Sequence, residues 1–128
     1  MEKVSLTRNN GVSIITLNRP SSYNAIDVET MEQLLEKIEQ VEKNDDSIVI
    51  LTGAGKAFSA GGDITMMKQL HDTTQFDNVM QTLEAIALKL YMLPKITIAA
   101  VNGPAVGLGL SLALNSDYIV ACFLLASL

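Results

Sequence analysis

Two loops rich in glycine contain the residues of this chain that are best suited to chemistry. The first loop, 53–65, follows an apolar run at 48–51, and the second loop, 102–110, follows an apolar run at 96–101. Because glycine has no side chain, such loops let a ligand approach the backbone and can present bare N–H groups. Two loops of this kind after two strands predict one site built from backbone amides.

Neither loop fits a phosphate-binding motif. The Gly-Lys pair at 55–56 lacks the preceding glycine and the following Ser or Thr of a phosphate loop, because Ile50 and Ala57 occupy those positions. The Gly-x-Gly at 107–109 lacks the third glycine of a dinucleotide turn, because Leu112 stands in its place. Taken singly, each loop is more consistent with an ordinary strand-to-helix turn.

Composition describes a globular chain of one domain. The 128 residues are 48% hydrophobic and 18% charged, with a net charge of −5. We expect no nucleic-acid partner, because phosphate binding needs a basic face. One histidine, His71, and one cysteine, Cys122, cannot supply a zinc site, so no metal is expected. A lone cysteine fits a reducing compartment, and we expect a cytoplasmic protein.

Strands and helices alternate along the chain, with no apolar run long enough to span a membrane. The order β-β-α-β-α-α-β-α-β predicts an α/β sheet with parallel neighbours. The strands at 47–52 and 96–101 do not alternate, which predicts burial on both faces. Apolar stripes that include Val28, Phe76 and Met80 predict which helix faces pack inward. The predicted strands are 3–8, 12–17, 47–52, 96–101 and 117–121, and the predicted helices start near Val28, Ile64, Thr73 and Gly107.

The sequence resembles the enoyl-CoA hydratase/isomerase family, also called the crotonase superfamily. Four stretches carry the resemblance, in the family's order and spacing, over residues 3 to about 121. They are Asn18-Arg-Pro-x-x-x-Asn24-Ala25, Gly55-Lys-Ala-Phe-Ser-Ala-Gly-Gly-Asp-Ile64, Pro94-Lys-x-x-Ile98-Ala-Ala-Val-Asn-Gly-Pro-Ala-Val-Gly107, and Ser111-Leu-Ala-Leu with Ser116-Asp117.

The resemblance implies a truncated crotonase-like (ClpP/crotonase) α/β fold, a ββα spiral. Residues 1–121 would form the N-terminal part of an acyl-CoA-binding domain, and 122–128 an apolar tail that departs from the family. Family chains are considerably longer and form trimers or pairs of trimers. We therefore expect a homotrimer or hexamer only for a full-length chain.

The resemblance also implies a site. The substrate would be an acyl-CoA thioester, with coenzyme A as part of the substrate and no bound cofactor. The backbone amides of Gly62 and Leu108 would form an oxyanion hole for the thioester enolate. The same amides, together with the rest of the loop, would contact coenzyme A; these further residues are Ala60, Gly61, Asp63 and Ile64.

The residues that would transfer protons depart from the pattern of the family's hydratases. Hydratases of the family place a carboxylate three residues after the second amide, where this chain has Ser111. A serine has no useful pKa near neutrality, so Ser111 is either a catalytic group of another kind or a small residue packed within a helix. Asp63 is either a base or a helix cap. Met66 and Met67 either flank the acyl group or pack within their helix.

Three functions follow from these observations. The first is an acyl-CoA enzyme of hydratase/isomerase type. The second is a non-catalytic, truncated CoA-binding or interaction fragment, motivated by the serine at position 111 and by the apolar tail. The third, a doubly wound nucleotide-binding domain, rests on fold analogy alone and lacks every phosphate motif tested above.

Overall fold

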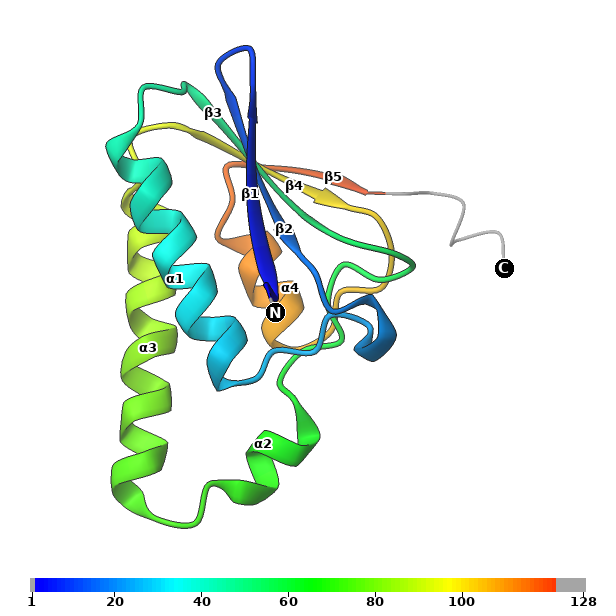
Figure 1. Cartoon of the computed structure of the whole chain (residues 1–128), viewed down its shortest axis with the longest axis vertical. Helices are drawn as coiled ribbons and strands as arrows, with labels where there is room; N and C mark the ends of the chain where they lie inside the picture. The colour runs from blue at the N-terminus through cyan, green and yellow to red at the C-terminus, as the bar shows by residue number, and fades with distance from the viewer. Residues whose placement is uncertain (1, 122–128) are drawn as a thin grey trace.

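A five-stranded mixed sheet forms the centre of the molecule, seen in Figure 1 with its helices beside it in a computed structural model that describes residues 2–121. The strand order follows the sequence order. The strands are β1 Val4–Asn9, β2 Val12–Leu17, β3 Ile48–Gly53, β4 Ile96–Val101 and β5 Tyr118–Ala121. The helices are α1 Val28–Lys43, α2 Ile64–Gln69, α3 Thr73–Met92 and α4 Leu108–Leu114, with a short 3-10 helix, η1, at Pro20–Ser22.

The predicted order of elements is confirmed, and so is the hairpin. Strands β1 and β2 are antiparallel, with Asn9 opposite Val12. Asn10 and Gly11 between them both have positive φ, 51° and 82°, as a tight hairpin turn requires. The remaining neighbours, β2-β3, β3-β4 and β4-β5, are parallel. Only η1 has no counterpart in the sequence prediction.

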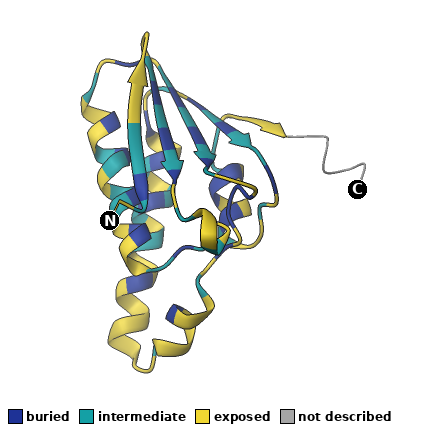
Figure 2. Ribbon diagram, turned by 45° about the vertical axis from the view of Figure 1, so that its right-hand side comes forward, coloured by how far each residue is buried: buried dark blue, intermediate teal, exposed yellow. Residues whose placement is uncertain are grey.

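The core lies between the sheet and the helices α1, α3 and α4, as the dark-blue residues in Figure 2 show. Helix α1 packs against α3 and against strands β1 and β2. Asp27 caps α1 by accepting a hydrogen bond from the Thr30 N–H at 2.8 Å, which confirms the predicted start of this helix. The buried residues of α1 are Thr30, Met31, Leu34, Ile38 and Val41.

The prediction that the central strands are buried on both faces is wrong for the described part of the chain. Along β3, Val49 and Leu51 are buried, whereas Ile48 and Ile50 are only half-buried. The buried residues of the sheet and of the three helices form one core cluster, so the helices cover one face. An apolar run indicates that both faces of a strand can be buried. It does not indicate whether residues 2–121 contain the elements that would pack on both faces.

Two of the predicted apolar helix stripes, those of α1 and α3, include residues that are exposed in the structure. Val28 is exposed at the first turn of α1, and Phe76 and Met80 are exposed on the N-terminal half of α3. In Figure 1 this half of α3 extends beyond the sheet, next to α2. The stripe therefore continues past the sheet that would bury it. The predicted tail 122–128, including Cys122, lies outside the described residues.

Candidate active site

The two glycine loops lie against each other because the strands that they follow, β3 and β4, are parallel neighbours. Ser59 of the first loop pairs with Ala105 of the second as an isolated parallel bridge. The Ser59 N–H donates to the Pro104 carbonyl at 3.2 Å, and the Val106 N–H donates to the Ser59 carbonyl at 3.0 Å. The loops therefore form one continuous patch of backbone.

Two asparagine side chains hold the first loop in shape. The buried Asn24 donates from Nδ2 to the carbonyl oxygens of Ala54 and Ala57, both at 2.9 Å. Asn102 accepts the Gly53 N–H at 3.1 Å through Oδ1. These contacts join three separate segments of the chain. The sequence motifs included both asparagines without indicating this role, which depends on long-range neighbours.

The Gly62 N–H is left without a partner by the way its neighbours are bonded. Gly61 has a φ of +94°, which favours glycine, and its N–H donates to Ser59 Oγ at 3.1 Å. Ile26 then pairs with both sides of Gly62: its N–H donates to the Gly61 carbonyl at 2.8 Å, and its carbonyl accepts the Asp63 N–H at 2.9 Å. Among the described residues, none accepts a hydrogen bond from the Gly62 N–H.

A tight turn exposes the Leu108 N–H in a similar way. Gly107 has φ +53° and ψ −116°, the geometry of the first central residue of a type II′ turn. The Gly109 N–H closes this turn by donating to the Val106 carbonyl at 2.9 Å. Leu108 is the first residue of α4, where an N–H has no partner within the helix. No acceptor for it exists in the part of the chain that the structure describes.

Gly62 and Leu108 line the same pocket, which has a volume of about 250 Å³. The structure thus brings together the two predicted oxyanion-hole residues. Met66 and Met67 also line this pocket, so it is bounded by α2 as well as by the loops. The remaining lining residues are Met31, Leu70, Phe76, Val79, Met80 and Leu83. All of these side chains are apolar, so the pocket can hold an apolar group beside the backbone of Gly62 and Leu108.

Ser111 is not among the residues that line this pocket. It is exposed in the middle of α4, where its hydroxyl donates to the Gly107 carbonyl at 3.3 Å. It lines a neighbouring cavity that shares Met31, Leu83 and Leu108 with the first pocket but does not include Gly62. Ser111 is thus exposed beside an apolar cavity, and both interpretations of this residue remain predictions.

The other predicted loop residues do not line this pocket. Ala60 is exposed, and its N–H donates to the Tyr23 carbonyl at 2.9 Å. Ile64 is 72% exposed at the start of α2. Asp63 accepts the Met66 N–H at 2.9 Å through Oδ1, which confirms that it caps α2.

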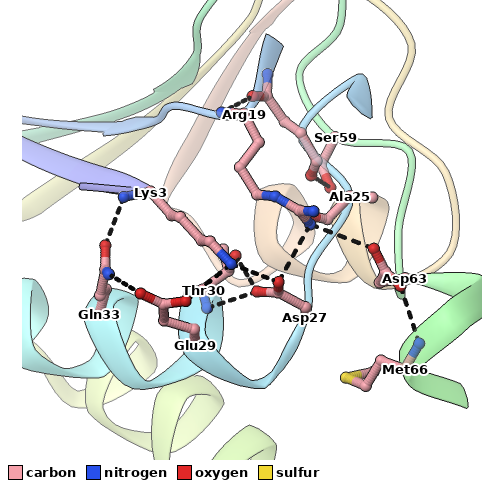
Figure 3. Close-up of polar contacts among 11 residues, drawn as sticks. Lys3, Arg19, Ala25, Asp27, Glu29, Thr30, Gln33, Ser59, Asp63 and Met66 are labelled. Carbon is pink, nitrogen blue, oxygen red and sulfur yellow. Dashed lines mark hydrogen bonds and ion pairs between the residues drawn. The ribbon is translucent and has the colours of Figure 1, made fainter. Parts of the chain in front are cut away.

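Charged side chains gather beside the first glycine loop, at the N-termini of α1 and α2 (Figure 3). Arg19 Nη1 lies 3.4 Å from Asp63 Oδ2 and 3.7 Å from Asp27 Oδ2. Lys3 Nζ contacts Asp27 Oδ2 at 2.7 Å. Burial raises the pKa of Asp27, but hydrogen bonds from Lys3 and Thr30 and the charge of Arg19 outweigh it and lower the pKa to about 2. The sequence prediction assigned no role to Arg19.

Neither metal ligands nor a membrane-spanning helix are found in the described range 2–121. His71 is exposed, and there is no group of three or more His, Cys, Asp or Glu side chains able to hold an ion. No helix within this range has the length and apolar character needed to cross a bilayer.

Comparisons with known proteins give a consistent result. The family model described as enoyl-CoA hydratase/isomerase matches residues 7–122. YhaR of Bacillus subtilis (strain 168), which carries an enoyl-CoA hydratase/isomerase name, is 47% identical over 121 residues, covering 94% of this chain and 48% of that protein. The 1,2-epoxyphenylacetyl-CoA isomerase of Escherichia coli (strain K12) is 39% identical over 117 residues, covering 87% of this chain and 44% of the isomerase.

Solved structures give the same result at the level of the fold. An enoyl-CoA hydratase from Shewanella pealeana superposes with a TM-score of 0.90 at 32% identity, covering 94% of this chain and 46% of the hydratase. An enoyl-CoA hydratase from Thermoplasma volcanium gives a TM-score of 0.88 at 34% identity, covering 93% and 48%. The chain therefore spans about half the length of the relatives that it matches.

Proposed function

Since the chain belongs to the enoyl-CoA hydratase/isomerase family, we propose that it binds an acyl-CoA thioester and stabilises the thioester enolate with the backbone N–H groups of Gly62 and Leu108. One observation carries this proposal. Gly62 and Leu108, whose N–H groups have no acceptor among the described residues, both line one apolar pocket. An apolar acyl group could occupy this pocket while its thioester oxygen accepts both hydrogen bonds.

The chemistry follows from where charge develops. Removing a proton next to the thioester carbonyl moves negative charge onto its oxygen. Donors already fixed towards that oxygen need no rearrangement during the reaction, and one such donor is typically worth about 10²–10³ in turnover rate. The bonds made by Asn24, Asn102 and Ser59 hold the first loop before any ligand arrives.

The rest of the substrate would lie along the rim. Exposed Ala60 and Ile64 are available to pack against the adenine and pantetheine of coenzyme A, which enters as part of the substrate. Methionines in the pocket suit acyl groups of varied shape because their side chains are flexible and polarisable. We place this activity in the cytoplasm, and in a trimer or hexamer where the chain is full-length.

A second candidate function is binding of the thioester without turnover. It is favoured by the lining of the pocket, which is apolar throughout and offers no general acid or base of its own. Ser111, the residue at the expected position of a carboxylate, lines the neighbouring cavity instead. In this case the two amides would hold the thioester oxygen without a proton transfer.

Substitution by proline at position 108 tests the proposal directly. Proline has no N–H, and it is well tolerated at the first position of a helix. Leu108→Pro thus removes the proposed donor, whereas Leu108→Ala removes the same side chain and keeps the N–H. With crotonyl-CoA, turnover is measured from the absorbance of the conjugated thioester, and polarisation of its carbonyl from the red shift of that absorbance on binding.

We expect the wild-type chain and Leu108→Ala to bind crotonyl-CoA with a red shift, and Leu108→Pro to lose most of it. Where turnover occurs, Leu108→Pro lowers it by about 10²–10³ relative to Leu108→Ala. A red shift without turnover in the wild type identifies the binding function. The proposal is wrong if the wild-type chain produces no red shift at saturation, or if the two variants behave alike.

A further inference from the structure

Arg19 lies between the two aspartates that cap α1 and α2, as Figure 3 shows. Asp27 uses Oδ1 to cap α1, and Asp63 uses Oδ1 to cap α2. Both aspartates turn Oδ2 towards Arg19 Nη1, at 3.7 Å and 3.4 Å respectively. The side chain of Arg19 is only 19% exposed, so its contacts are partly shielded from water. One guanidinium thus connects the starts of two helices.

The same nitrogen of Arg19 also holds the backbone beside Gly62. Nη1 donates to the Ala25 carbonyl at 2.6 Å. The next residue, Ile26, makes the two backbone hydrogen bonds on either side of Gly62. Arg19 therefore holds the residue that precedes Ile26, and Ile26 makes the backbone pairing that leaves the Gly62 N–H without an acceptor.

The backbone of Arg19 is itself fixed, so its side chain starts from a defined point. Its N–H donates to Asn24 Oδ1 at 2.8 Å, and its carbonyl accepts from the N–H groups of Ser22 and Asn24 at 3.0 and 2.9 Å. Lys3 Nζ also contacts Asp27 Oδ2, at 2.7 Å, but it makes no contact with Asp63 or the Ala25 carbonyl. Without the guanidinium, Asp63 Oδ2 and the Ala25 carbonyl oxygen would lose the donor that joins them to Asp27, and the repulsion between these oxygens would favour separation of the segments.

Both helices supply walls of the pocket that contains Gly62 and Leu108. Helix α1 contributes Met31, and α2 contributes Met66 and Met67. A shift of α2 relative to α1 would therefore change the pocket and the direction of the Gly62 N–H together.

We propose that Arg19 is a positioning residue, which sets the placement of the α1 and α2 N-termini and thereby aims the Gly62 N–H into the pocket. The part of this proposal that concerns ligands rests on the proposed function above. The geometric part does not, because it concerns the free protein.

Arg8 provides a matched control for an arginine substitution. It also lies between two aspartates: Nε and Nη2 donate to Asp46 at 2.7 and 3.0 Å, and Nη2 donates to Asp45 at 2.9 Å. Arg8 pairs with Ser13 near the hairpin turn, whereas the loop that carries Gly62 follows the other end of the sheet, where Leu17 pairs with Gly53. Arg8→Gln thus removes a comparable ion-pair group far from the pocket.

The experiment compares Arg19→Gln with Arg8→Gln in the full chain. Hydrogen exchange in the free protein is measured at the Asp63 and Met66 N–H groups, which bond to Ile26 and to the Asp63 cap. The free energy of unfolding of each variant is measured alongside, so that local opening is separated from global unfolding. The red shift of the crotonyl-CoA absorbance at saturation then reports how strongly the two N–H groups polarise the thioester carbonyl.

We expect both amides to exchange about 5-fold faster in Arg19→Gln, beyond any global loss of stability, since a partly buried ion pair is lost next to a helix cap. Arg8→Gln leaves them unchanged. Arg19→Gln also reduces the crotonyl-CoA red shift at saturation, while Arg8→Gln keeps the wild-type shift.

The outcomes separate the two proposals. If the wild-type chain shows no red shift, the proposed function fails and the exchange comparison alone decides whether Arg19 positions the loop. If exchange at both amides is the same in Arg19→Gln and Arg8→Gln after correction for stability, Arg19 has no positioning role. If exchange differs but both variants give the wild-type red shift, Arg19 orders the α2 N-terminus without aiming the Gly62 N–H, and the proposal is overturned.

Discussion

At the scale of single residues, polar side chains act mainly by fixing backbone. Asn24 and Asn102 bond to carbonyls and N–H groups of the first glycine loop, and Arg19 bonds to the Ala25 carbonyl. In each case the partner is a main-chain atom brought close by the fold. The donors proposed for the reaction are themselves main-chain atoms, so these side chains act on the site without belonging to its surface.

Asp46, at the opposite end of the sheet, is instead held by other side chains. Its carboxylate accepts hydrogen bonds from Arg8 and, at 2.6 Å, from Ser13 Oγ. These bonds, led by that from Arg8, outweigh the effect of burial and lower the pKa of Asp46 from 3.8 to about 2. Because the folded pKa lies below the unfolded value, the carboxylate stabilises the fold above pH 4, and this contribution is lost as the pH falls towards 2.

We therefore predict that Asp46→Asn flattens the pH dependence of stability between about pH 4 and 2. The free energy of unfolding, measured by urea titration at several pH values, falls with acid less steeply in the variant than in the wild type. The control is Asp45→Asn, whose side chain is 97% exposed although it also contacts Arg8. A wild-type slope in Asp46→Asn, or an equally flattened slope in Asp45→Asn, would contradict the prediction.

At the scale of elements, the start of α4 matters most to the site. The type II′ turn at Gly107 determines which way the Leu108 N–H points before the helix begins. An L-residue is strained at φ +53° and ψ −116°, even though nothing lies within 4 Å of the place that a Cβ at Gly107 would take. The constraint on this position is thus conformational and not one of space.

Gly107→Ala should accordingly relax the turn and rotate the Leu108 N–H away from the pocket. We predict a loss of most of the crotonyl-CoA red shift, and a turnover about 10²-fold lower where turnover occurs. The control is Gly11→Ala in the hairpin, where φ is +82° and a Cβ also meets nothing within 4 Å. Both variants lose stability through backbone strain, of the order of 1–3 kcal/mol. Equal red shifts in the two variants would refute the assignment of Leu108 as a donor.

Local features of the elements could be predicted from the sequence, and features of their packing could not. The Asn10-Gly11 turn and the Asp27 and Asp63 caps depend on neighbours within a few residues, and the structure contains all of them. Burial of the second face of β3 depends on whether other segments pack against it. The sequence of the strand itself does not contain that information. The contacts of Arg19 join residues up to 44 positions apart, so no local pattern indicates them.

At the scale of the whole molecule, the two edges of the sheet differ. Strand β5 presents the exposed apolar residues Tyr118, Ile119 and Val120, and within residues 2–121 it pairs only with β4. Strand β1 at the opposite edge ends in the exposed polar residues Thr7, Arg8 and Asn9. The matched relatives are about twice as long as this chain. We infer that the β5 edge suits a segment of the kind that those relatives carry outside the match.

The half of Bacillus subtilis YhaR that lies outside the match provides a test. We predict that this half binds when mixed with the chain and raises its melting temperature and, where turnover of crotonyl-CoA occurs, increases that turnover. Ile119→Lys, at the exposed β5 edge, should abolish these gains because it places a charge in an apolar contact. Thr7→Lys, at the exposed β1 edge, should leave them intact. The inference is wrong if neither variant alters binding of the added half, or if both do so equally.

The path of the main chain has a consequence for how such a site can change. The proposed donors of Gly62 and Leu108 are main-chain atoms, whereas Met66, Met67 and Met80 line the pocket with side chains. If the proposed function holds, substitution of these methionines would change the shape of the pocket without removing a proposed donor. Selection for a new acyl group and preservation of the proposed chemistry would then act on different residues.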